Sequence, residues 1–149
     1  MLMAKGLRRR RDQRGAAAVE VAIIAPLIGL LLAALIGGWR IGWARAQVAE
    51  AAAAGARAAT IPVSAAAAHA QASTAISSDL ATVGVHCQTL DTSIDTSAYA
   101  LPVGTPGQVH VQVNCVLNLS DLLVPGLPGQ LNINATASEA LDTFRERTP

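Results

Sequence analysis

The chain has 149 residues, of which 52% are apolar, 3% aromatic and 14% charged. This length suits one domain, the apolar content excludes an intrinsically disordered chain, and the 31 alanines argue against a large soluble enzyme because alanine fills little core volume. The net charge of +1 conceals an uneven distribution, since residues 1–14 hold six Lys or Arg and one Asp, a local charge of +5. Residues 58–144 hold six acidic side chains and no Lys or Arg, so we expect the two ends to meet different surroundings.

The chain begins with a basic leader, residues 1–15, followed by an uncharged apolar stretch at 21–39. As a helix this stretch spans ~28 Å, close to the ~30 Å of a bilayer's hydrocarbon core. By the positive-inside rule the leader stays cytoplasmic and the chain beyond the stretch is exported. We expect no nucleic-acid binding by the leader, because a membrane helix follows it directly. The arginines that set this topology are Arg8, Arg9, Arg10, Arg11 and Arg14.

One charged residue, Glu20, lies at the start of the apolar region, five residues after Gly15. A carboxylate near a membrane is costly, which makes it a functional candidate by default. If a protease cuts after Gly15, the new amine on Ala16 lies one helical turn, about 6 Å, from Glu20. Glu20 can then neutralise that amine, or the amine of a neighbouring subunit, and it lies in the first turn, where the helix dipole favours an anion.

The basic leader, the glycine before a cut, the glutamate and the apolar helix together resemble the signal of type IV prepilins. Residues 14–60 resemble the TadE-like family of tight-adherence (Flp) pilus assembly proteins, and residues 115–145 resemble the C-terminal part of actinobacterial members. Val21 departs from the family, which more often has phenylalanine there. The resemblance implies a prepilin peptidase, other pilin-like proteins and an inner-membrane assembly platform as partners. The matching features are Arg14-Gly15, Val19-Glu20, Ala22, Pro26, the leucine-rich run and residues 56–59.

Pro26 lies inside the expected helix, which runs from about Ala16 to Thr60 and ends before Pro62. Proline removes a backbone hydrogen bond and clashes with the preceding turn, so we expect a kink or local melting there. Small residues recur at every fourth position of this helix, a spacing that lets helices approach closely in lipid. The two rows are Ala25, Gly29, Ala33, Gly37 and Ala34, Gly38, Gly42, Ala46.

The exported part, residues 63–149, is predicted to be α+β. Ser64 is a suitable N-cap for a second, alanine-rich helix that ends near Thr82. Apolar residues then alternate with polar ones at 109–116 and 131–138, and 85–89 is a shorter third strand candidate. The turn-rich segments 102–107 and 125–129 are predicted loops. We therefore expect a small antiparallel sheet beside the alanine-rich helix.

Cys87 and Cys115 are each expected on the apolar face of a strand. Because the exported compartment is oxidising and the domain's core is thin, we expect a disulfide between them. The alternative is a zinc site that adds His86 and His110 to the two cysteines. Adjacent strand residues point to opposite faces, so His86 and Cys87 cannot easily bind one ion, and we expect no metal or other cofactor.

These features favour a TadE-like minor pseudopilin of a tight-adherence pilus or related secretion filament, held in the plasma membrane by one helix or incorporated in a pilus. No catalytic motif appears, so we expect a substrate of the peptidase, cut between Gly15 and Ala16, and not an enzyme. One alternative is an uncleaved single-pass protein with a small exported interaction domain. A second is a soluble domain released by ordinary signal peptidase beyond Ala49.

Overall fold

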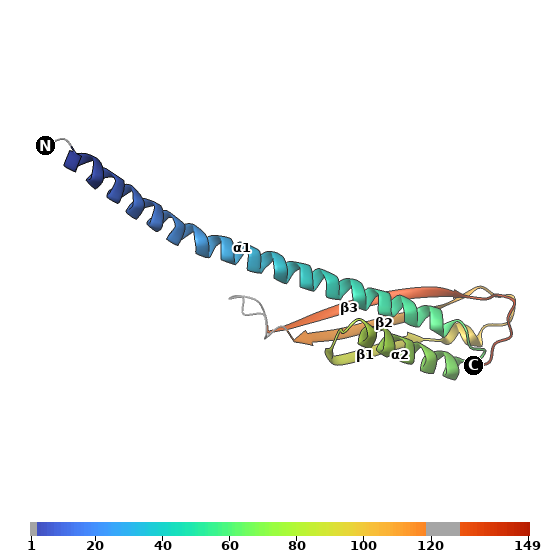
Figure 1. The fold of residues 1–149 in the computed structure, drawn as a ribbon. Coiled ribbons are helices and arrows are strands. Elements are labelled where there is room, and N and C mark those ends of the chain that lie inside the picture. Colours follow the sequence, from blue (N-terminus) through green and yellow to red (C-terminus); the bar gives the residue numbers. More distant parts are fainter. Residues whose placement is uncertain (1–2, 119–128) are drawn as a thin grey trace. The chain divides into compact units, whose positions relative to one another are not determined.

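The computed structural model describes residues 3–118 and 129–149, and describes side chains from residue 18 onward. Helix α1 (Met3–Ala59) is followed by α2 (Ala65–Thr82), and three strands complete the chain (Figure 1). The chain divides into two compact units, Met1–Trp39 and Arg40–Pro149, and α1 contributes residues to both. The predicted α+β class is confirmed.

Helix α1 begins earlier than the sequence indicates. It begins at Met3, so the expected start near Ala16 is wrong. The leader holds five Arg, two Leu, one Lys and one Gln, all of which have high helix propensity, and Gly6 and Gly15 each cost only about 1 kcal/mol. The helix is not interrupted at Pro26, so the local melting expected there is not observed, and the kink stays a prediction.

Helix α2 confirms the predicted cap and end. The Ser64 hydroxyl accepts a hydrogen bond from the backbone N–H of Ala67 at 3.3 Å, which satisfies one of the free donors at the helix start. The helix ends at Thr82, and Gly84 follows with φ of +73°, a conformation that residues with a Cβ rarely adopt. This left-handed residue turns the chain from α2 toward the sheet.

The sheet has three antiparallel strands in the order β1 (Cys87–Asp95), β2 (Gly107–Asn118) and β3 (Gln130–Leu141). Strands β2 and β3 contain the predicted ranges 109–116 and 131–138. Strand β1 starts later and runs much further than the predicted 85–89. It holds two Asp residues, a type depleted in strands, and only three apolar residues, so its strand signature is weak. Pairing with β2 over almost its whole length makes it a strand.

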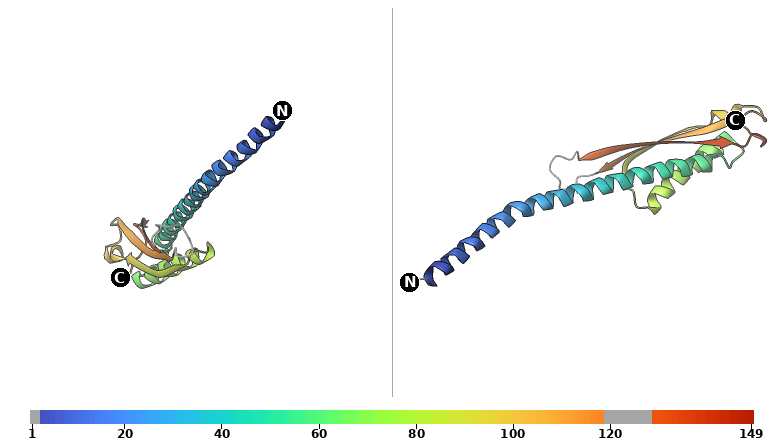
Figure 2. Two further views of the ribbon diagram at one scale, coloured as in Figure 1. Left: turned by 90° about the vertical axis from the view of Figure 1, so that its left-hand side faces the viewer. Right: turned by 90° about the horizontal axis from the view of Figure 1, so that it is seen from above.

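One face of the sheet and the two helices enclose the core of the second unit (Figure 2). The α1 part of this core consists of small residues, whereas β2 contributes the alternating Val109, Val111 and Val113. A short 3-10 helix, η1 (Ser97–Ala100), adds the buried Tyr99. The helical residues of the core are Ala44, Val48, Ala51, Ala52, Ala56 and Ala59 on α1, and Ala68, Ala72, Ile76 and Leu80 on α2.

The C-terminal segment returns to the connection between the two helices. Thr148 donates its backbone N–H to the carbonyl oxygen of Val63 at 2.8 Å, and its own carbonyl accepts the N–H of Ala65 at 3.0 Å. These bonds form an isolated parallel bridge between Ser64 and Thr148. The predicted loop at 125–129 lies outside the described residues, apart from Gly129.

Candidate functional site

The first half of α1 presents its apolar side chains outward. Every large apolar side chain from Val19 to Trp39 is 44–70% exposed. One helix of the described chain, within Ala18–Ala59, is long and apolar enough to cross a membrane, and none of the residues in its most apolar window is buried. An apolar helix that exposes this much surface needs lipid or neighbouring helices around it. The finding fits a single-pass membrane protein.

The predicted signal residues lie on this same helix. Gly15 and Ala16 are both inside α1, so the bond between them is helical in the intact chain. Glu20 is exposed. In the intact chain Glu20 is five turns beyond the helix start, and it comes to lie in a first helical turn only if the chain is cut after Gly15.

Three glycines of the predicted rows of small residues face open space, whereas Gly37 is buried. A Cβ added at Gly29, Gly38 or Gly42 would meet no atom within 4 Å. Gly55, further along α1, behaves differently, because a Cβ there would lie 2.6 Å from Cγ1 of Ile76. The absence of a side chain at Gly55 is therefore what lets α2 approach α1.

The two cysteines form a disulfide, as predicted. The bond joins Cys87 at the start of β1 to Cys115 within β2, with Cα atoms 5.3 Å apart. Cys115 is fully buried in the core and Cys87 packs against it. Because the two sulfurs are bonded to each other, neither is available as a thiolate, and the zinc alternative is wrong. Among the described residues, no group of three or more His, Cys, Asp or Glu side chains could hold a metal ion.

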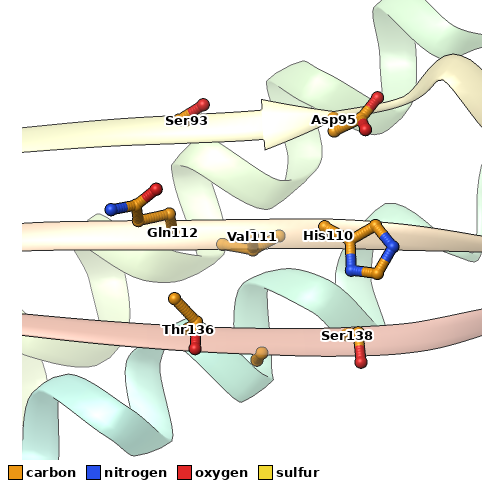
Figure 3. A pocket seen from close by; sticks show the side chains of 8 residues that line it. Ser93, Asp95, His110, Val111, Gln112, Thr136 and Ser138 are labelled. Carbon is orange, nitrogen blue, oxygen red and sulfur yellow. The ribbon is translucent and has the colours of Figure 1, made fainter.

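The outer face of the sheet is polar and holds a shallow depression of about 350 Å³ (Figure 3). His110 lies there between Asp95 and Ser138, its neighbours across the strands. Asp95 accepts a hydrogen bond from the backbone N–H of Ser97 at 2.9 Å, and this bond is the main reason why its pKa is lowered. The carboxylate thus supports the turn into η1. The other lining residues are Ser93, Val111, Gln112, Thr136 and Ala137.

Tyr99 is a structural residue that the sequence reasoning missed. Its hydroxyl lies 2.6 Å from the carbonyl oxygen of Ala59 and 3.1 Å from that of Pro62, so it binds the end of α1. Burial raises the pKa of this phenol, and the nearby charges of Arg145 and Arg147 lower it in part. Tyr99 is the only tyrosine of a chain with few aromatic residues, which is the one sequence feature that pointed to it.

Arg147 was also missed. Its guanidinium is buried and donates to the carbonyl oxygens of Ala98 at 3.2 Å and Thr105 at 3.0 Å, and to those of Asp142 and Thr143. One side chain thus joins η1, the following loop and the segment after β3. Arg145 and Arg147 stand close together near the C-terminus, and no sequence pattern indicates that one of them is buried against backbone carbonyls.

Comparison with known proteins gives a family match for the N-terminal segment of the chain. Residues 15–57 match the model of a family described as TadE-like protein, which confirms the family that the sequence resembles over this segment. The match begins at Gly15 and includes Glu20 and Pro26. No curated protein and no solved structure shows significant similarity to the chain.

Proposed function

From the TadE-like segment at residues 15–57, we propose that this chain is a minor pseudopilin of a tight-adherence (Flp/type IVb) pilus or a related secretion filament. It is cut by a prepilin peptidase and acts in pilus assembly as a structural subunit, not as an enzyme. Its partners are other pilin-like proteins and the inner-membrane platform. The observation that carries the proposal is the register of Gly15 and Glu20 with an exposed apolar helix inside the family match.

The charge pattern supports a cytoplasmic leader. The +5 leader stands directly before the apolar half of α1, and the segment from 58 to 144 holds only acidic charges. With the leader inside, the peptidase site lies at the cytoplasmic surface and the sheet is exported. The disulfide agrees with this, because disulfides persist in oxidising compartments.

Cleavage requires the helix to open around Gly15. Proteases bind extended backbone, and glycine lowers the cost of leaving the helix by about 1 kcal/mol relative to alanine. We expect Gly15→Leu to leave the precursor uncut, as measured by mass and by N-terminal sequencing of the membrane-bound protein. Gly29→Leu is the control, because position 29 is open and far from the bond. Mature protein beginning at Ala16 in the Gly15→Leu variant would refute the prepilin assignment.

Glu20 is proposed to act in assembly. After cleavage its carboxylate neutralises an Ala16 amine that would otherwise enter an apolar bundle unpaired, and breaking a buried charge pair costs about 3–5 kcal/mol. We expect Glu20→Ala to be inserted and cut, and to lose co-purification with pilin-like subunits. Glu50→Ala is the matched control, because Glu50 lies on the same helix and pairs with Arg57 of its own chain at 2.8 Å. Wild-type co-purification of Glu20→Ala would remove Glu20 from the assembly contacts.

A second candidate is an uncleaved single-pass anchor. The observation in its favour is the unbroken helix through Gly15 and Ala16. N-terminal sequencing of the wild-type protein separates the two, since the anchor keeps the residues before Ala16 and the cleaved protein begins at Ala16. Release by signal peptidase beyond Ala49 has less support, because such a cut removes Val48 from the core and falls among the buried residues of α1.

A further inference from the structure

Both outer strands of the sheet are free edges. The strand order is β1-β2-β3, so β1 and β3 each pair with β2 on one side only. Within the part of the chain that the structure describes, neither strand makes a backbone hydrogen bond outside its ladder with β2. An edge strand presents a row of free N–H and C=O groups that can pair with a strand of another molecule. The sheet therefore has two sides at which a strand can be added.

Neither edge has the residues that most often prevent strand addition, which are proline and lysine. Strand β1 has 9 residues and β3 has 12, and neither contains Pro, Lys or Arg. The only irregularity of register is a shift near the start of β1, and residues 89–95 pair without interruption. The charged side chains of both strands are carboxylates, namely Asp91 and Asp95 on β1 and Glu139 on β3. A pairing between edges must therefore place these carboxylates beside uncharged residues.

The two free edges run in the same direction. Strands β1 and β3 are each antiparallel to β2, so they are parallel to each other. A second copy placed beside the first without rotation brings its β1 next to β3 as a parallel neighbour. Residues 40–59 of α1 then run in the same sense in both copies and lie on the same face of the joined sheet. This suits copies held in one membrane, whereas an antiparallel pair of two β3 strands would direct these helices oppositely.

The rows across the sheet show which residues would meet. Each β2 residue sets one β1 residue level with one β3 residue, as His110 does for Asp95 and Ser138 (Figure 3). A β2 residue bonds to one neighbour only, so where the β1 residue directs its N–H and C=O toward β2, the level β3 residue directs its own to the free side. Opposite residues of a parallel pair alternate in the same way. A second copy at the same height therefore satisfies the hydrogen bonds of the new ladder.

The side chains brought together at this height are complementary. Asp91 of one copy lies opposite Asn134 of the other, and Asp95 lies opposite Ser138. The amide N–H of Asn134 and the hydroxyl of Ser138 can each donate to a carboxylate. Glu139 lies beyond the end of the neighbouring β1, so it meets no acidic residue of that strand. The apolar residues that meet on the inner face are Leu90 with Ile133 and Ile94 with Ala137.

We propose that β3 of one copy pairs in parallel with β1 of a second copy of this chain, which joins their two sheets into one. About eight backbone hydrogen bonds form over the 9 residues of β1. The contact is heterologous and leaves one free edge on each copy, so it can repeat. It forms between copies confined to one membrane, where the effective concentration is high. The contact involves only the second unit, so it does not rest on the proposed function or on cleavage at Gly15.

Disulfide crosslinking of the full-length chain in membranes tests the contact and its register. Two differently tagged copies are co-expressed, one with Thr136→Cys and the other with Ser93→Cys, at exposed positions that Gln112 sets level on the outer face (Figure 3). The native cysteines are bonded to each other and supply no free thiol. We expect a mixed dimer after mild oxidation.

Two matched controls change one position each. Gln112→Cys replaces Thr136→Cys, because it is exposed in the same row but lies on β2, one strand further from the next copy. Thr89→Cys replaces Ser93→Cys, because it is exposed on the same edge but lies about 13 Å away along the strand. We expect each control pair to give at least about tenfold less mixed dimer, since a disulfide requires Cα atoms within about 7 Å.

A charge exchange tests the facing residues. Asn134→Asp in the Thr136→Cys copy places a carboxylate opposite Asp91 of the other copy, and like charges directly opposite destabilise strand pairing. We expect the yield to fall about three- to fivefold, and Asp91→Asn in the Ser93→Cys copy to restore it. A native disulfide that stays unreactive in each variant shows that the unit is folded.

Four outcomes would overturn the edge contact. They are no mixed dimer from Thr136→Cys and Ser93→Cys, an equal yield from either control pair, no loss or no rescue in the charge exchange, and linkage of Thr136→Cys only to another protein. Each of these outcomes leaves N-terminal sequencing as a separate test of the proposed function.

Discussion

The two halves of α1 are built from different apolar residues and meet different surroundings. In the first half, side chains such as Leu30 and Ile36 are large, apolar and exposed. In the second half, one face of the helix is buried against α2 and the sheet, through alanines and Val48. The first half thus exposes its large apolar side chains, and the second half packs against its own domain.

The difference shows what small residues do in each environment. Gly29 and Gly38 in the first half face open space, and small residues at this spacing let helices approach closely in lipid. Gly55 in the second half is in contact with α2, because the side chain of Ile76 occupies the space that a Cβ at position 55 would need. The same residue type therefore leaves open surface in one half and permits a contact within the chain in the other.

The largest expected effect is a loss of membrane insertion, which a charge should cause in the first half of α1 and not in the second. Leu30→Asp places a charge near the centre of the apolar stretch, at a cost of about 3 kcal/mol for insertion. We expect most of this variant to be lost from the membrane fraction after carbonate extraction. Ala49→Asp, at an exposed position of the second half, is expected to stay in the membrane. Equal extraction of the two variants would contradict a membrane-spanning first half.

The disulfide should affect only the second unit. Its two cysteines are 28 positions apart in the chain, a loop for which the chain-entropy estimate gives about 3–4 kcal/mol. We expect Cys87→Ser to lower the free energy of unfolding by this amount in detergent, measured by urea titration with circular dichroism. Membrane insertion should be unchanged. Two reactive thiols in wild-type protein that has not been reduced would contradict the disulfide.

Substitutions at two glycines test the helix contact directly. Gly55→Ala forces a Cβ against Ile76, and overpacking of this kind costs about 1–3 kcal/mol. Gly42→Ala enters open space and removes a residue with poor helix propensity, which is worth up to about 1 kcal/mol. Thermal unfolding should therefore shift in opposite directions for the two variants. A stabilised Gly55→Ala would mean that α2 does not depend on this close approach.

The smallest effect concerns the end of α1. Tyr99→Phe removes the hydroxyl that binds the Ala59 carbonyl, at a cost of about 1–2 kcal/mol. The pKa of Tyr99 is raised in the fold, so its contribution is complete below the unfolded pKa near 10 and is lost as pH rises through the folded pKa. Unfolding titrations between about pH 8 and 11 should show a steeper loss of stability for wild type than for Tyr99→Phe. Parallel curves would contradict this role.

The sequence alone determined the parts of the protein that depend on local pattern. The apolar run, the Ser64 cap, the end of α2 and the alternation in β2 and β3 are visible in neighbouring residues, because helix and strand periods are short. The family match rests on the same kind of information, since Gly15, Glu20 and Pro26 lie within one continuous stretch. The cysteine pair was predicted from its compartment and its strand faces.

Only the tertiary structure decided the features that join distant segments. Strand β1 forms because β2 supplies its backbone hydrogen-bond partners. The Tyr99 hydroxyl donates a hydrogen bond to the carbonyl oxygen of Ala59 at the end of α1, 40 residues earlier in the chain. Arg147 donates hydrogen bonds to backbone carbonyls of η1, the loop after it and the segment after β3. Every residue has such a carbonyl, so the sequence does not mark which ones Arg147 binds. Local periodicity carries no information about which segments meet, because that depends on how the helices and the sheet pack around one core.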